Sequence, residues 1–74
     1  MKINVRIVIM SHLSDAQEIG GMMAHQNSEK ERKANCNYQR HHINFAKYLL
    51  FDCDGDLDKE YTDEELDEIW NKVK

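Results

Sequence analysis

The sequence predicts an all-α fold, in which a long antiparallel helical hairpin carries a short third helix packed across its open end. Three observations support this prediction. Apolar residues recur at steps of three and four along three separate segments, as in helices that pack through one face. The chain contains no proline, so nothing interrupts a long helix. Two Ser/Thr-x-x-Glu sequences mark helix starts. We expect a single small helical domain over residues 1–74.

The first helix is predicted to precede a polar break at residues 26–28. Its packed face is expected to comprise Val5, Ile9, His12, Ala16, Ile19 and Met23. A strand is the alternative over residues 3–9, where apolar side chains occupy alternate positions. The chain offers no evident second strand, so a strand here would need another subunit, and a helix is favoured. The Gly20-Gly21 pair either ends the helix or allows a close approach to the next one.

The second helix is predicted to begin near Glu29, because Ser28 and Glu31 form a capping pair. It should end at the turn-forming residues Asp54-Gly55-Asp56. Its packed face is expected to comprise Tyr38, His42, Phe45 and Leu49.

The third helix is predicted to run from Asp63 to about Val73. Thr62 and Glu65 form its capping pair. Its apolar stripe is Leu66, Ile69, Trp70 and Val73. We expect Trp70 to pack against the hairpin, because an indole carries much of the apolar area of so short a helix.

Negative charge is concentrated in residues 52–68, which hold ten carboxylates and one lysine. Such charge destabilises a compact chain unless a cation or a basic partner meets it. We therefore expect a small cytosolic protein that binds another macromolecule and is not an enzyme, such as an inhibitor or regulator of a basic, nucleic-acid-handling partner. Small acidic proteins of this style occur among phage- and mobile-element-encoded inhibitors. The expected partner-binding residues are Asp54, Asp56, Asp58, Glu60, Glu64 and Asp67.

A divalent-cation module is the alternative interpretation of the same stretch. A twelve-residue frame from residue 54 resembles the calcium-binding loop of an EF-hand, which supplies oxygen ligands at alternate positions between two helices. The resemblance implies calcium ligands at Asp54, Asp56, Asp58 and Glu65. The frame departs from the pattern because Lys59 stands where that loop needs glycine, and Tyr61 stands where it has a branched aliphatic residue.

Histidines form a further candidate group. In a hairpin that turns about residue 27, residues whose numbers sum to about 54 lie opposite each other, so His12 should face His42 and Asp15 should face Gln39. His12, Asp15, His41 and His42 would then lie close together. A polar seam of His12, Asp15 and His42 that fixes the helix register is the favoured interpretation. A zinc-like site in a small metalloenzyme is the weaker one.

Composition narrows the remaining classes of function. The basic residues Lys30, Arg32, Lys33, Arg40 and Lys47 spread around the second helix. With a net charge of −4 they do not favour direct nucleic-acid binding, and they are expected to meet the acidic end within the molecule or between subunits.

No segment reaches the roughly 20 apolar residues of a membrane span, so no membrane contact is expected. The two cysteines lie far apart on one predicted helix, which favours free thiols and a cytoplasmic location. No cofactor is expected. The partner is expected to be a protein. A homo-oligomer is also expected, because the packed face of the first helix extends at its Val5–Ile9 end past what three helices can cover.

Overall fold

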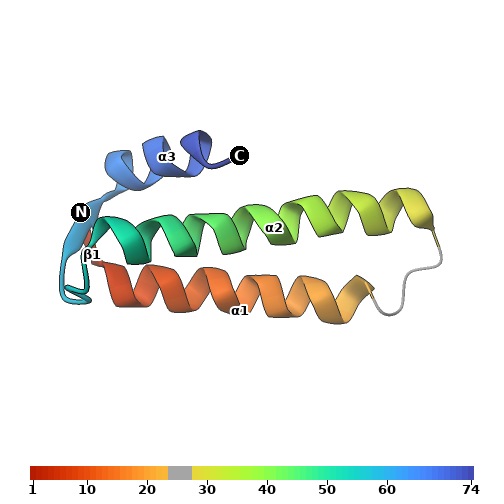
Figure 1. Cartoon of the computed structure of the whole chain (residues 1–74), viewed down its shortest axis with the longest axis horizontal. Coiled ribbons are helices and arrows are strands. Elements are labelled where there is room, and N and C mark those ends of the chain that lie inside the picture. Colours follow the sequence, from red (N-terminus) through yellow and green to blue (C-terminus); the bar gives the residue numbers. More distant parts are fainter. Residues whose placement is uncertain (24–27) are drawn as a thin grey trace.

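The computed structural model describes residues 1–23 and 28–74 and confirms the helical hairpin (Figure 1). Helix α1 spans Val5–Met23 and helix α2 spans Glu29–Asp52. The short helix α3, Asp63–Lys72, packs near the open end of this hairpin. Two three-residue strands, β1 (Lys2–Asn4) and β2 (Glu60–Thr62), form a small sheet. No described helix is long and apolar enough to cross a membrane.

The beginning of the chain combines the two alternatives that its sequence offers. Residues 2–4 form a strand, and the helix starts immediately afterwards at Val5, whose backbone N–H donates to the carbonyl of Lys59 (2.8 Å). Strand β1 pairs antiparallel with β2, and Ile3 lies opposite Tyr61. The expectation that such a strand needs another subunit is therefore wrong. The partner strand lies within the acidic stretch, where three residues are too few to show a period-two pattern.

The hydrophobic core lies at the open end of the hairpin, between the two long helices, the sheet and α3. Its buried members are Val5, Val8, Ile9, Phe45, Ala46, Leu49, Cys53 and Tyr61. Partly buried residues complete it: Ile3, Leu57 and the predicted α3 stripe of Leu66, Ile69, Trp70 and Val73. The Val5–Ile9 end is thus covered within one molecule, and the argument that it needs a second subunit is wrong. Tyr38 is also not part of the buried seam, since half of its surface (52%) is exposed.

The predicted starts of α2 and α3 and the predicted end of α2 are confirmed. Thr62 and Glu65 form a reciprocal capping box at the start of α3, with bonds of 3.2 and 3.1 Å. The Ser28 hydroxyl accepts a weaker bond from the Glu31 N–H (3.4 Å). Helix α2 ends where Asp54 (φ 52°) and Gly55 (φ 83°) adopt left-handed conformations. Of the predicted break at residues 26–28, positions 26 and 27 lie outside the described residues.

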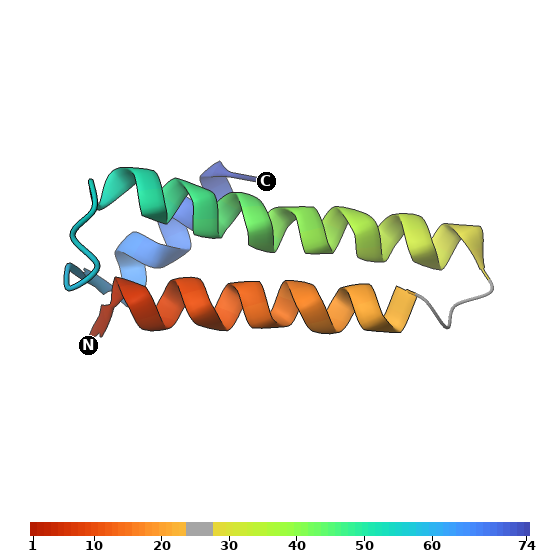
Figure 2. The ribbon, with the colours of Figure 1, turned by 60° about the horizontal axis from the view of Figure 1, so that its bottom comes forward.

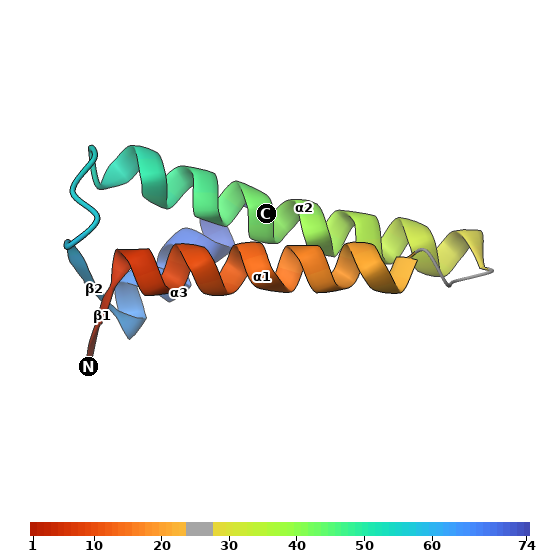
Figure 3. The same cartoon turned by 90° about the horizontal axis from the view of Figure 1, so that it is seen from below.

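Helix α3 covers only one side of the hairpin. In Figures 2 and 3 it passes behind α1 and α2, and no described element crosses the near side. His12 of α1 and His41 of α2 face Trp70 of α3. At 100° per residue, four exposed apolar residues of the two helices point roughly 100–180° away from these histidines. We call them the open hairpin face: Met10 (64% exposed), Leu13 (42%), Ile43 (37%) and Leu50 (47%).

Candidate functional site

The register of the hairpin places the predicted histidine pair together. Nδ1 of His12 lies 2.7 Å from Nδ1 of His42, which confirms that these two residues face each other. One turn away, the side-chain amide of Gln39 donates to the carbonyl of Ala16 (2.9 Å). A Cβ at Gly20 would lie only 2.9 Å from the same amide nitrogen. Gly20 therefore leaves room for the Gln39 side chain, and α1 continues past it to Met23.

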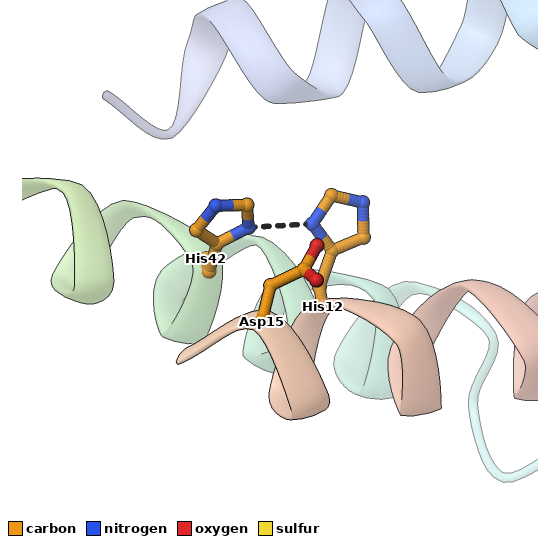
Figure 4. Close-up of side chains that lie close together, drawn as sticks. All are labelled: His12, Asp15 and His42. Carbon is orange, nitrogen blue, oxygen red and sulfur yellow. Dashed lines mark hydrogen bonds between the residues drawn. The ribbon is translucent and has the colours of Figure 1, made fainter. Parts of the chain in front are cut away.

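Asp15 completes a group of three potential metal ligands with the two histidines. One ligand atom from each of His12, Asp15 and His42 lies within 4.8 Å of the others, and Figure 4 shows the carboxylate turned toward the two rings. His12 and Asp15 share one face of α1 because they are three residues apart. His42 reaches them from α2. In the part of the chain that the structure describes, these three residues are the one group of potential metal ligands.

The hydrogen bond between the two rings constrains their protonation. A contact between two Nδ1 atoms needs a proton on one and a lone pair on the other, so the two rings cannot both be charged. Burial lowers the pKa of both histidines. For His12 the nearby His42 lowers the pKa further, whereas for both rings the Asp15 carboxylate opposes the shift. Both rings are therefore mainly neutral at pH 7, the form in which histidine binds metals.

His41 does not join this group, so the expectation that it lies together with His12, Asp15 and His42 is wrong. Its ring stacks on Trp70 with centroids 3.5 Å apart, and its Nε2 lies 2.7 Å from the Trp70 carbonyl oxygen. Because that carbonyl can only accept, Nε2 carries the proton. Adjacent residues on a helix point about 100° apart, so His42 enters the seam while His41 faces α3. His41 thus satisfies a carbonyl in the last turn of α3.

Aromatic side chains surround the histidine pair. The Phe45 ring packs in a T-shaped arrangement with the His12 ring, and the Tyr38 ring packs likewise with the His42 ring. In each pair the ring centroids are 4.6 Å apart. The centroid of the Trp70 ring lies 5.3 Å from that of His12 and 5.0 Å from that of His42. The sequence pattern assigned Trp70 and Phe45 to helix packing alone, but they also form the apolar wall of the candidate site.

Two surface hollows adjoin the group. One, of about 270 Å³, is lined by Asp15, Glu18, Ile19, Met22, Tyr38 and His42. The other, of about 260 Å³, is lined by Val8, His12, Phe45, Leu66, Asp67 and Trp70. Water and small solutes can therefore reach both histidines, even though His42 itself is only 4% exposed.

The carboxylates of the proposed calcium frame are not brought together. The Asp56 carboxylate accepts the N–H of Asp58 (3.1 Å), and Asp58 forms an ion pair with Arg6 (3.6 Å). Glu65 is engaged in the capping box of α3. Within residues 1–23 and 28–74, no group of three metal-binding side chains includes these residues or Asp54. The frame does not form one loop, since its positions seven to nine are strand β2.

Tyr61 is a structural residue that the sequence analysis did not identify. It is 2% exposed, and its hydroxyl donates to the Asp52 carboxylate at 2.6 Å. This bond lowers the pKa of Asp52, and burial raises the pKa of Tyr61 above its usual value of 10.0. The Lys59 ammonium lies 3.5 Å from the same carboxylate and 4.9 Å from the Tyr61 ring centre. A lone aromatic residue inside an acidic stretch is the signal that could have indicated a core anchor.

The basic residues of α2 do not neutralise the acidic end within the molecule. The ion pairs among the described residues are Arg6–Asp58 and Lys59–Asp52, and neither involves α2 lysines or arginines. The expectation that these basic residues meet the acidic end within the molecule is therefore wrong. Only a contact between molecules would bring the two charged regions together.

Comparison with known proteins gives no further guide to the site. No protein-family model matches the chain, and neither a curated protein nor a solved structure matches it. Any function must therefore be argued from the geometry of the described residues.

Proposed function

We propose that this protein acts by binding a basic macromolecule, most simply a protein, through its acidic end and that it is not an enzyme. The observation that carries the proposal is the exposure of the six predicted contact residues: Asp54, Asp56, Asp58, Glu60, Glu64 and Asp67. Of these, only Asp58 takes part in an ion pair among the described residues. Five exposed carboxylates thus stand without a neutralising lysine or arginine.

The placement of these carboxylates on ordered structure supports the same proposal. They lie on the turn after α2, on β2 and on the exposed side of α3. Tyr61 anchors β2 to the core, and Leu66 and Trp70 anchor α3. A charged surface that is already ordered loses little conformational entropy on binding, so more of the contact energy contributes to affinity. It also attracts an oppositely charged partner from a distance and raises the association rate.

A charge-matched pair of variants tests the proposal. Glu60→Gln with Glu64→Gln removes two charges from the acidic end, and Glu29→Gln with Glu31→Gln removes two from the start of α2 at the far end of the hairpin. All four side chains are exposed, so circular dichroism should show intact helices in both variants. Proteins captured by the wild type at low salt are identified, purified and returned to a stopped-flow measurement of association.

The acidic-end variant should associate more slowly with the captured partner, while the α2 variant should keep the wild-type rate. The wild-type rate should also fall steeply as salt rises, because exposed charges are screened over a Debye length of about 8–10 Å. Equal association rates for the two variants at low salt would show that the acidic end is not the binding surface.

A further inference from the structure

We propose that His12, Asp15 and His42 bind one divalent transition-metal ion, with zinc as the best match and water at the remaining position. This inference is independent of the proposed macromolecule-binding surface, which lies on other residues. It rests on three side chains from two helices whose ligand atoms lie within 4.8 Å of one another (Figure 4).

The ligand set selects the class of metal. Two imidazole nitrogens and one carboxylate oxygen suit zinc and other first-row transition ions, whereas calcium and magnesium prefer all-oxygen sites. Three protein ligands with an open position form the arrangement of an accessible zinc site rather than a closed structural one. The hollow beside Asp15 and His42 leaves room for a water ligand, and Glu18 lines that hollow one turn further along α1.

The distances show what must move when a metal enters. The two Nδ1 atoms are 2.7 Å apart, whereas two nitrogens on one tetrahedral zinc, each about 2.0–2.1 Å from the metal, lie roughly 3.3 Å apart. The rings must therefore separate by about 0.6 Å. The ring that carries its proton on Nδ1 must also shift that proton to Nε2, so that both Nδ1 lone pairs face the metal. His12 is only partly buried and faces a hollow, so a small rotation of its side chain provides this space.

The surroundings favour binding in two ways. Phe45 and Tyr38 pack against the two rings in T-shaped contacts and restrict large rotations of these rings, so the ligands are partly preorganised. The ion would also join α1 to α2 at a point beyond the main cluster of buried residues. Because the metal would bind the folded chain far better than the unfolded chain, it should raise the melting temperature.

The test uses the full chain freed of metal with a chelator. Zinc, cobalt and calcium are added separately, and stoichiometry is measured by native mass spectrometry and affinity by calorimetry. The cobalt complex gives an absorption spectrum that reports coordination number. We expect one zinc per chain, a visible cobalt band, and a rise in melting temperature of about 10 °C or more at a hundredfold excess of zinc over its dissociation constant. Calcium should do none of these.

Variants locate the site. His12→Gln should abolish stoichiometric zinc binding, and Asp15→Asn should weaken it about tenfold or more. His41→Gln is the matched control, because it removes the neighbouring imidazole, which faces Trp70 instead. Asp63→Asn is the control for loss of one carboxylate, since this residue is exposed at the start of α3. Circular dichroism confirms that each variant is folded before titration.

Two outcomes would overturn the proposal. One is the absence of any zinc-dependent change in mass, cobalt spectrum or melting temperature in the wild type. The other is an equal loss of binding in His41→Gln and His12→Gln, which would indicate scattered surface binding. The Glu60/Glu64 variant separates the two proposals, because it should bind zinc as the wild type does even if it no longer binds a partner.

Discussion

Replacing Tyr61 with phenylalanine tests how the sheet and the acidic end are held to the hairpin. Phenylalanine keeps the buried ring and removes only the hydroxyl that donates to the Asp52 carboxylate at 2.6 Å. Any loss of stability therefore reports on that one hydrogen bond and not on a cavity in the core.

The size of the effect follows from the charge and exposure of the acceptor. A hydrogen bond to a charged group contributes about 1.5–3 kcal/mol. The Asp52 side chain is 38% exposed, so water can replace part of the lost bond, and we expect about 1–2 kcal/mol. For a chain of this length that corresponds to a fall in melting temperature of roughly 5–15 °C.

The difference between wild type and Tyr61→Phe should depend on pH in a defined way. The folded-state pKa of Asp52 is lowered from 3.8, so its stabilising contribution is present above that value and is lost as pH falls through the folded-state pKa. The pKa of Tyr61 is raised above 10.0, so the wild type also loses stability above that pH, whereas phenylalanine does not ionise. The difference should thus be largest between about pH 5 and 9 and shrink on both sides.

Thermal and urea unfolding across this pH range provide the assay. Tyr48→Phe is the control, because its hydroxyl accepts a hydrogen bond from the Lys72 ammonium at the surface (3.2 Å) and its loss should change stability by less than about 0.5 kcal/mol. An unchanged melting temperature for Tyr61→Phe at pH 7 would refute the reasoning. So would a difference that stays constant from pH 3 to pH 7.

Three further predictions concern packing. Trp70→Ala should cost about 2–4 kcal/mol in urea unfolding, because the indole contacts both the core and His41; an unchanged midpoint would mean that α3 is not held by this residue. Gly21→Ala should stabilise the protein by about 0.5–1 kcal/mol because its Cβ would meet nothing within 4 Å, whereas Gly20→Ala should gain less because its Cβ would lie 2.9 Å from the Gln39 amide; equal gains would contradict a restraint on Gly20 by the Gln39 side chain. Sedimentation should detect a dimer that buries the open hairpin face, and Leu13→Lys should shift it to monomer; a wild type that sediments as an 8.8 kDa monomer at micromolar concentration would rule this out.

Local rules account for what the sequence predicted well. Helix starts at Ser28 and Thr62 depend on side chains within three residues of the backbone groups that they satisfy, so they can be identified without tertiary contacts. The turn at Gly55 depends on a backbone conformation that glycine adopts readily. The pairing of His12 with His42 could be predicted as well, because a hairpin between two regular helices leaves few choices of register.

Contacts between distant segments decided the rest. Strand β2 exists because Glu60–Thr62 can pair with β1, some 58 residues earlier in the chain, and three residues carry no periodic signal of their own. Tyr61 is part of the core for the same reason, although it lies in an acidic stretch of the chain. His41 and His42 have the same chemistry and adjacent positions, yet the packing of α3 draws one to Trp70 and leaves the other beside Asp15. The sequence by itself determined that three helices form and where α2 and α3 begin, since caps and turns depend on near neighbours. Only the tertiary structure decided where α1 begins and which side chains meet, because that depends on how the helices and strands pack.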